Sequence, residues 1–358
     1  MTSLTGLAEV VDVVIGVDTH VRSHAAAAVA AGTGGVIEDL TVAALGRGYT
    51  ELLGWADDLA EDHGALRAWA IEGTGSHGAG LARYLRECGE LVIELDRPER
   101  AKRRNGAKSD PLDAVRAARE ALSRARLGTP RRGGDRQALS VLLAARRSAV
   151  AAAGVAQRQV FSLVIAAPEP IRARFGGQKL KAMVTTAAAL RGHPSWDLES
   201  MTTVTVLRQL ARRAQALQAE ADDYEQRLKH IIKAWRPDLL DQVGVGPIVA
   251  AVILCAWSHP GRIHSEAGFA MLAGVAPIEA TSGQVTDRHR LNRYGDRQLN
   301  RALHTIVISR QRSHPATRDY TQRRTGQGKN PREIRRCLKR YIARDIFRLL
   351  EHPGLDAT

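Results

Sequence analysis

The first 125 residues alternate short apolar runs with amphipathic segments, and this order constrains the fold more than any other feature of the chain. Val11 to Val17 is a continuous apolar run rich in β-branched residues, which predicts a buried strand. Two more strands, Ala25 to Ala30 and Val36 to Val42, are expected at hairpin spacing around a glycine-rich turn. Three strands joined by short turns form an antiparallel meander.

Helices and strands alternate after this meander. The predicted order is helix, strand, helix, strand, helix, over Tyr49–Glu61, Leu66–Ile71, His77–Cys88, Leu91–Leu95 and Pro111–Ala125. Strands that are separated by helices join a sheet in parallel. The whole succession is that of the ribonuclease H-like fold, so we expect an α/β domain of this kind over residues 1–128.

Residues 129–236 are predicted to be a helical linker or coiled-coil region. Long helices are expected over Arg136–Ile165 and Val204–Trp235, with an irregular stretch, Ala167–Met201, between them. The second helix carries a heptad seam made of Leu207, Leu210, Ala214, Leu217, Ala221, Tyr224 and Leu228. Such helices either pack as an antiparallel pair within one monomer or mediate dimerisation, and the sequence favours neither.

Residues 237–358 are expected to form a mainly helical, strongly basic domain. The net charge of the chain is +14, and Thr286 to Arg348 alone contains 18 Lys/Arg against 5 Asp/Glu. Positive charge concentrated in this way favours a polyanionic partner, with DNA or RNA as the default. A generally arginine-rich composition is the alternative, but the N-terminal part is not comparably basic.

Several classes of protein are not expected from this sequence. No apolar run approaches the roughly 20 residues that span a bilayer, and Ile248 to Trp257 is expected to be a buried helix. The N-terminus shows no signal-peptide pattern. The cysteines, Cys88, Cys255 and Cys337, lack metal-ligand spacing and indicate a reducing cytoplasm. ATP is not implied, because no phosphate-binding GxxxxGK[ST] motif occurs.

Four carboxylates stand at the predicted ends of elements in the first domain. Asp18 closes the first strand and Glu72 the fourth, and these strands are neighbours in the ribonuclease H-like order. Asp110 and Asp113 open the next helix and share one face of its first turn. Converging carboxylates suit Mg²⁺. Two such ions about 4 Å apart stabilise the attacking and leaving oxygens of a phosphodiester.

Helix capping is a simpler explanation for two of these acids. Asp110 before Pro111 suits an N-cap, and Asp113 suits the helix dipole. Capping does not cover Asp18 and Glu72, because an isolated acid that ends a buried strand is costly unless it is paired or metal-bound. The four acids together therefore predict a metal site.

A glycine turn precedes the apolar helix of the last domain. Gly244 and Gly246 allow a tight turn whose backbone N–H groups face outward at a helix start, which suits a phosphate. This pattern is typical of a helix-hairpin-helix-like element that grips a nucleic-acid backbone. A plain turn between helices fits the same residues.

Ser282 is a candidate nucleophile. It precedes Gly283 on an expected exposed turn, and a series of arginines follows it: Arg288, Arg290, Arg293, Arg297 and Arg301. A serine hydroxyl attacks phosphate when a base accepts its proton, and guanidinium groups hold phosphate oxygens. A Ser-Gly pair is more often only a turn, and the arginine face also fits a solvated surface or a simple phosphate-binding strip.

These motifs together resemble the DEDD-type transposases of bacterial insertion sequences, a family described as bridge-RNA-guided recombinases. GVDTH, AIEGTGS and KSDPLDA look like the first domain of that family. GVGPIVAAVIL, FAMLAGVAPIEATSGQ and NRYGDRQLNRALH are similar to its second domain, so the resemblance covers nearly the whole chain. It implies a RuvC-like domain in which Asp18, Glu72, Asp110 and Asp113 bind Mg²⁺. It also implies that Ser282 forms a covalent link to DNA.

The resemblance further implies the partners and the setting. They are donor and target DNA, a guide RNA from the element, and a homodimer that pairs into a tetramer with a composite site, in the bacterial cytoplasm at the nucleoid. DNA invertases that flip pilin genes share the motifs. The residues leave two rivals open: a junction-resolving nuclease that uses water with the same acids, and a nucleic-acid-binding protein with a decayed acidic site.

Overall fold

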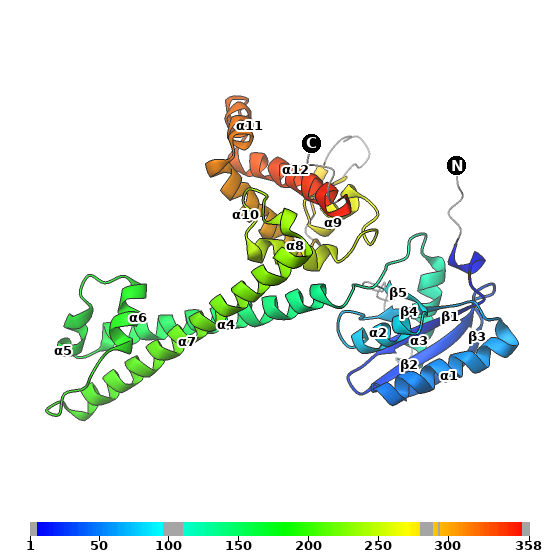
Figure 1. Ribbon diagram of the computed structural model, residues 1–358, viewed down its shortest axis with the longest axis horizontal. Coiled ribbons are helices and arrows are strands. Elements are labelled where there is room, and N and C mark those ends of the chain that lie inside the picture. The colour runs from blue at the N-terminus through cyan, green and yellow to red at the C-terminus, as the bar shows by residue number, and fades with distance from the viewer. Residues whose placement is uncertain (1–5, 96–109, 280–288, 293, 353–358) are drawn as a thin grey trace. The chain divides into compact units, whose positions relative to one another are not determined.

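The computed structural model describes residues 6–95, 110–279, 289–292 and 294–352. The chain divides into two compact units, Met1–Gly133 and Gly134–Thr358 (Figure 1). Each unit has hydrophobic cores of its own. The first unit contains all five strands of the larger sheet, and the second is mostly helical. The α/β prediction for the N-terminal part and the mainly helical prediction for the C-terminal part are both confirmed.

The first unit is built on a mixed sheet of strand order β3-β2-β1-β4-β5. The strands are β1 (Val13–Thr19), β2 (Ser23–Ala30), β3 (Val36–Ala43), β4 (Arg67–Glu72) and β5 (Leu91–Leu95). The first three strands form the expected antiparallel meander, and β4 and β5 add in parallel beside β1. β4 ends at Glu72 and β1 ends at Thr19, one residue after Asp18, so both acids lie at the ends of their strands, as expected.

Helices cover both faces of this sheet (Figure 1). After η1 (Leu7–Glu9), they are α1 (Gly46–His63), α2 (Ala79–Glu87) and α3 (Asp110–Ser123). Ile15 and Val17 of β1 pack beneath α1 and α2, whereas Val14 packs beneath α3. Successive side chains of a strand point to opposite faces, so residue parity decides which helix a side chain reaches.

The second unit begins with an antiparallel helical hairpin of α4 (Asp135–Ala166) and α7 (Leu198–Trp235), which lie side by side (Figure 1). Arg146 of α4 pairs with Glu225 of α7 at 2.9 Å. The described chain thus pairs the helices within one monomer. α7 starts earlier than predicted because Asp197 caps it by accepting a hydrogen bond from the Ser200 N–H.

The heptad seam of α7 is only partly the one expected. Leu207, Ala214, Ala221 and Leu228 are buried, but the alternating positions Leu210, Leu217 and Tyr224 are half-buried. α4 extends one residue beyond each end of the predicted helix. By length and composition alone it could cross a membrane, but a core helix passes the same test, and α4 packs one face on α7.

The stretch expected to be irregular contains helices. These are α5 (Glu169–Arg172), η2 (Ala173–Phe175) and α6 (Leu180–Ala188). Ile171, Phe175 and Val184 are buried in one core with α4 and α7. Helices this short depend on tertiary packing rather than on propensity, so local sequence gave no signal for them.

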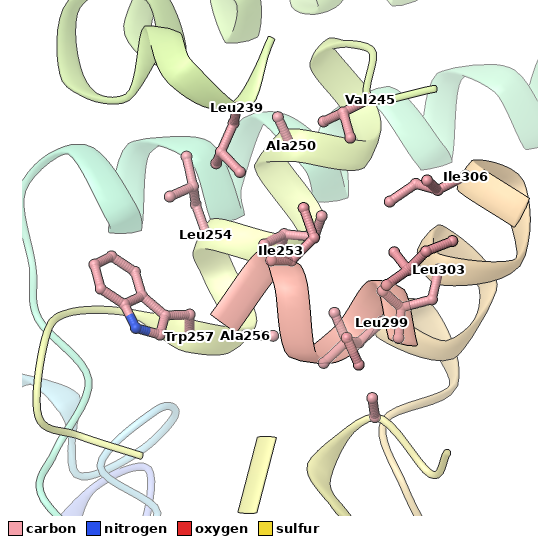
Figure 2. Packing of buried hydrophobic residues seen from close by; sticks show 14 of the residues in the cluster. Leu239, Val245, Ala250, Ile253, Leu254, Ala256, Trp257, Leu299, Leu303 and Ile306 are labelled. Carbon is pink, nitrogen blue, oxygen red and sulfur yellow. The ribbon is translucent and has the colours of Figure 1, made fainter. Parts of the chain in front are cut away.

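The C-terminal part of this unit packs several helices around one apolar core (Figure 2). Its elements are η3 (Pro237–Leu239), α8 (Pro247–Trp257), α9 (Glu266–Leu272), β6 (Pro277–Glu279), β7 (His289–Leu291), α10 (Arg297–Ser313), α11 (Pro315–Gly326) and α12 (Pro331–Glu351). α8 is buried as predicted: Ile253, Leu254 and Trp257 lie in this core with Leu303 and Ile306 of α10. The antiparallel pair of β6 and β7 was not predicted, because each strand is only three residues long.

Candidate active site

Asp18 and Glu72 lie side by side at one edge of the sheet. β1 and β4 are parallel neighbours, and their register pairs Val17 with Ile71, one residue before each acid. Gly16 and Ala70 face α3, so Asp18 and Glu72, two residues further along each strand, face α3 as well. The Thr19 hydroxyl donates to the Glu72 carbonyl oxygen at 3.0 Å and joins the two strand ends.

Helix α3 brings the other two acids to this face. It packs directly on β1 at Gly16, where an added Cβ would lie 2.0 Å from the Ala114 carbonyl oxygen and 2.5 Å from the Ala118 nitrogen. Only glycine allows so close an approach of helix and strand. Asp110 and Asp113 occupy the first turn of α3, immediately before this contact.

Three of the acids influence one another electrostatically. Burial raises the pKa of Glu72 above its ordinary value, and the negative charges of Asp18, Asp113 and Glu120 raise it further. Repulsion of this kind disfavours the ionised carboxylate unless a cation is present. Among the described residues, Arg116 neutralises part of the charge by pairing with Asp113 at 2.5 Å.

Asp110 reaches the site through a histidine that sequence reasoning did not assign. The His20 Nε2 lies 3.2 Å from Asp18 Oδ2 and 3.6 Å from Asp110 Oδ1. One possible ligand atom from each of these three residues lies within 4.8 Å of the others. His20 belongs to the GVDTH motif, and its position two residues after Asp18 was the signal that could have revealed it.

The donor set fits a divalent cation. Its oxygens come from carboxylates, which are hard ligands, and His20 adds one imidazole nitrogen. The negative charges of Asp18, Asp113 and Glu120 act on the partly buried Glu72 at this edge. Another buried acid, Glu94 of β5, does not share this face: it accepts a hydrogen bond from the Thr74 hydroxyl at 2.6 Å and contacts Arg131 at 3.3 Å.

The candidate nucleophile and part of the arginine series lie outside the described residues. These are Ser282, Arg288 and Arg293. Arg290 is in β7, where its backbone pairs with Ile278. Arg297 and Arg301 are exposed in the first turns of α10. The segment that contains Ser282 connects β6 to β7, and α10 begins a few residues after β7.

The glycine turn before α8 packs against α10. Gly244 has a φ of +86°, and an added Cβ would lie 3.0 Å from the Ser309 Cβ. The Arg310 side chain donates to the Val243 carbonyl oxygen at 2.9 Å. Gly246 caps α8, and nothing lies within 4 Å of its added Cβ. The helix before this turn is the short η3, so the turn joins η3 to α8.

Comparison with known proteins relates both units to transposases. A family profile described as Transposase, of the DEDD type, matches residues 15–164, which include all four acids. A second profile, Transposase IS116/IS110/IS902 family, matches residues 238–322, which include Ser282 and the arginine series.

Two relatives come from insertion elements. The IS900 uncharacterized 42 kDa protein of Mycobacterium paratuberculosis is 27% identical over 158 residues, which are 42% of this chain and 40% of that protein. The IS110 uncharacterized 43.6 kDa protein of Streptomyces coelicolor is 31% identical over 114 residues, 32% of this chain and 28% of that protein. Each match spans less than half of the relative. The two profiles and both relatives agree, and the chain belongs to the IS110 family of DEDD transposases.

Proposed function

We propose that the chain is a site-specific DNA recombinase, the transposase of a bacterial insertion sequence, which cuts and rejoins DNA through Ser282 with the help of Mg²⁺. One observation carries the metal part of this proposal. Acids from β1, β4 and α3 gather on one face of the sheet, and burial, together with the negative charges of Asp18 and Asp113, raises the pKa of Glu72. Such an edge is suited to a divalent cation and, through it, to a phosphodiester.

Asp18, Glu72, Asp110 and Asp113 hold the cation in this proposal, and His20 supports Asp18 and Asp110. When bound, Mg²⁺ supplies positive charge beside the reacting phosphodiester. The strands fix Asp18 and Glu72 through their backbone hydrogen bonds, so these two acids are held before substrate arrives. α3 carries Asp110 and Asp113 in its first turn.

The Ser282 Oγ attacks phosphorus in this mechanism. A bond forms between Oγ and phosphorus while the bond from phosphorus to one sugar oxygen breaks, and the serine proton passes through a base to that leaving oxygen. A sugar hydroxyl of the exchanged strand then attacks the phosphoserine: its oxygen bonds to phosphorus, the bond from phosphorus to Oγ breaks, and the hydroxyl proton returns through the base to Ser282. The arginine series orients the phosphate oxygens; its members are Arg288, Arg290, Arg293, Arg297 and Arg301.

The partners belong to the same proposal. Donor and target DNA are the substrates, a guide RNA from the element selects them, and the chain acts as a homodimer that assembles into a tetramer in the bacterial cytoplasm, at the nucleoid. Domains over 1–128, 129–236 and 237–358 would carry the metal site, the helical arm and the serine. Gly244 and Gly246 would contact a nucleic-acid backbone.

Two alternative functions use the same residues. A junction-resolving nuclease would need the four acids and water but not Ser282. A DNA invertase of the same family would need both sites and would differ in its DNA targets. The match of the second profile across residues 238–322 favours a function in which that segment takes part.

A covalent-adduct assay tests the proposal. Full-length protein, co-expressed with RNA from the flanks of the element, is mixed with supercoiled donor and target DNA and Mg²⁺, and the products are separated on a denaturing gel. Ser282→Ala and Asp18→Asn are compared with two matched controls, Ser313→Ala and Asp223→Asn, which alter exposed residues of α10 and α7.

We expect a protein–DNA adduct with the parent chain and both controls, and none with Ser282→Ala or Asp18→Asn. Strand breaks without an adduct that persist in Ser282→Ala would contradict the serine mechanism and support the nuclease. An adduct that persists in Asp18→Asn, or that forms equally well in a chelator, would contradict the metal site.

A further inference from the structure

The base of the β6–β7 hairpin is clamped to the start of α10. An added Cβ on Gly295 would lie 2.2 Å from the Gly274 nitrogen, so the two backbones touch. The Asn300 side-chain NH₂ donates to the carbonyl oxygens of Ala273, at 2.8 Å, and Gly274, at 3.3 Å. Asn300 of α10 therefore holds the chain just before β6, and the chain after β7 touches that same place through Gly295.

Asn300 also connects this clamp to α12. Its Oδ1 accepts a hydrogen bond from the Lys339 Nζ at 2.9 Å. His304 lies one helical turn after Asn300 on α10, and Arg335 lies one turn before Lys339 on α12. The Arg335 Nε is buried and has no hydrogen-bond partner among the described residues.

Positive charge accumulates between these two helices. The pKa of His304 is lowered by burial and by the positive charges of Lys339 and Arg335. The pKa of Lys339 is lowered by burial and by Arg336. Within the described part of the chain, every charge that shifts these two groups is positive. Cations that lie this close repel one another, and an anion between them relieves this repulsion.

We propose that His304, Arg335 and Lys339 form a phosphate-binding site between α10 and α12, and that it takes a phosphodiester of a nucleic-acid backbone beside the base of the β6–β7 hairpin. The proposal rests on the proposed function and deepens it by giving the nucleic acid a defined contact. A polymer fits better than a small free anion, because Arg297 and Arg301 continue an exposed basic track along α10.

Equilibrium binding tests this site. Fluorescence anisotropy of the full-length chain measures affinity for a labelled DNA duplex and, separately, for a labelled RNA hairpin across a series of salt concentrations. The test variant combines His304→Gln with Lys339→Met. The control combines Lys229→Met with His230→Gln, the same residue types at exposed positions of α7. Lys339→Arg keeps the charge and is the rescue.

We expect the test variant to bind one of the two nucleic acids about tenfold more weakly, with a salt slope smaller by about 1, as for one lost phosphate contact. Loss with the DNA alone identifies the phosphodiester as that of DNA, and loss with the RNA alone identifies it as that of the guide. The control and Lys339→Arg should bind like the parent chain.

Unchanged affinity and slope for both nucleic acids would overturn the site, as would an equal loss in the α7 control. His304→Gln alone, at an exposed position, serves if the double variant unfolds, and it should then weaken binding in the same direction. Binding requires no strand cleavage. Failure of the serine mechanism in the adduct assay would therefore leave this result intact, and the two failures are distinguishable.

Discussion

The two units carry charge in opposite ways. In the first, a few acids stand at the ends of hydrogen-bonded strands, so the backbone register fixes the spacing of Asp18 and Glu72. In the second, many cations lie on exposed helix faces, and single side chains such as Arg297 have neighbours of the same kind. A site of the first type depends on each member, whereas a surface of the second type acts collectively. Chemistry and affinity should therefore respond differently to mutation.

The largest expected effect is a loss of DNA cleavage without a loss of DNA affinity. Asp18→Asn should reduce Mg²⁺-dependent DNA cleavage by at least about a hundredfold, because a preorganised charge is lost where the reaction needs it. Its affinity for DNA should stay within about twofold of the parent chain, since the basic surface is untouched. Cleavage kinetics and anisotropy on the same preparations measure the two quantities.

Arg297→Ala with Arg301→Ala gives the opposite comparison. It should weaken DNA binding and lower the salt slope while leaving the Mg²⁺-dependent stability of the first unit unchanged. If Asp18→Asn weakened binding as much as this double variant does, the proposed separation between the two units would be wrong.

The next effect concerns the frame of the second unit. Arg236 is 7% exposed and holds the end of α12 by donating to the carbonyl oxygens of Leu349, at 2.8 Å, and Leu350, at 3.1 Å. It also pairs with Asp238 at 2.6 Å. Arg236→Met should lower the free energy of unfolding by about 3 kcal/mol, because buried polar groups lose their partner. Urea unfolding measures this, with the exposed Arg227→Met as the control.

A smaller effect tests the contact that places α3. Gly16→Ala should cost about 1–3 kcal/mol, because its Cβ would meet the backbone of α3. It should also weaken divalent-cation binding, since α3 carries Asp110 and Asp113. Gly54→Ala in α1, where nothing lies within 4 Å of the added Cβ, should leave stability the same or raise it. Equal melting temperatures for both variants would contradict the close packing described here.

The smallest effect reports on the acids themselves. The pKa of Glu72 is raised in the folded chain, so the native state holds this proton more tightly than the unfolded state does. The free energy of unfolding should therefore fall as pH rises from the ordinary pKa through the raised one. In a chelator, Glu72→Gln should melt slightly higher than the parent chain at neutral pH, and the difference should vanish in acid.

With Mg²⁺ present, the parent chain should melt at a higher temperature than Glu72→Gln. A cation that binds only the folded state stabilises it, so the parent chain should gain melting temperature and Glu72→Gln should gain less. Glu61→Gln, at an exposed position of α1, is the control for lost charge. If Mg²⁺ raised the melting temperature of Glu72→Gln as much as that of Glu61→Gln and the parent chain, Glu72 would have no part in the metal site.

The sheet could be predicted because each of its strands is marked by a pattern in its own short stretch of sequence. Apolar runs mark the strands of the first unit, and their order follows from the helices between them. The pairing of Asp18 with Glu72 follows from this order. The role of Gly16 could not be predicted, because the atoms it meets belong to α3, about a hundred residues away. His20 could have been predicted from its position in the GVDTH motif, but its contact with Asp110 depends on where α3 begins.

The second unit was harder to predict for the same reason. Long helices were found by their composition, but α6 and the pair of β6 and β7 are too short to give a periodic signal. The cluster of His304 and Lys339 joins two helices far apart in sequence, and only packing brings them together. Tertiary contact, not local pattern, decides such sites.

The helical hairpin of α4 and α7 leaves and rejoins the C-terminal core at one place, because Leu139 and Leu143 share that core with Leu228 and Ile232. The rest of the helical hairpin lies beyond these contacts, so the packing of the C-terminal core does not fix its length. Removing seven residues from each helix at facing positions would shorten the arm by about 10 Å and leave the core intact. The length of the α4–α7 hairpin can thus vary among natural sequences without any change in either charged site.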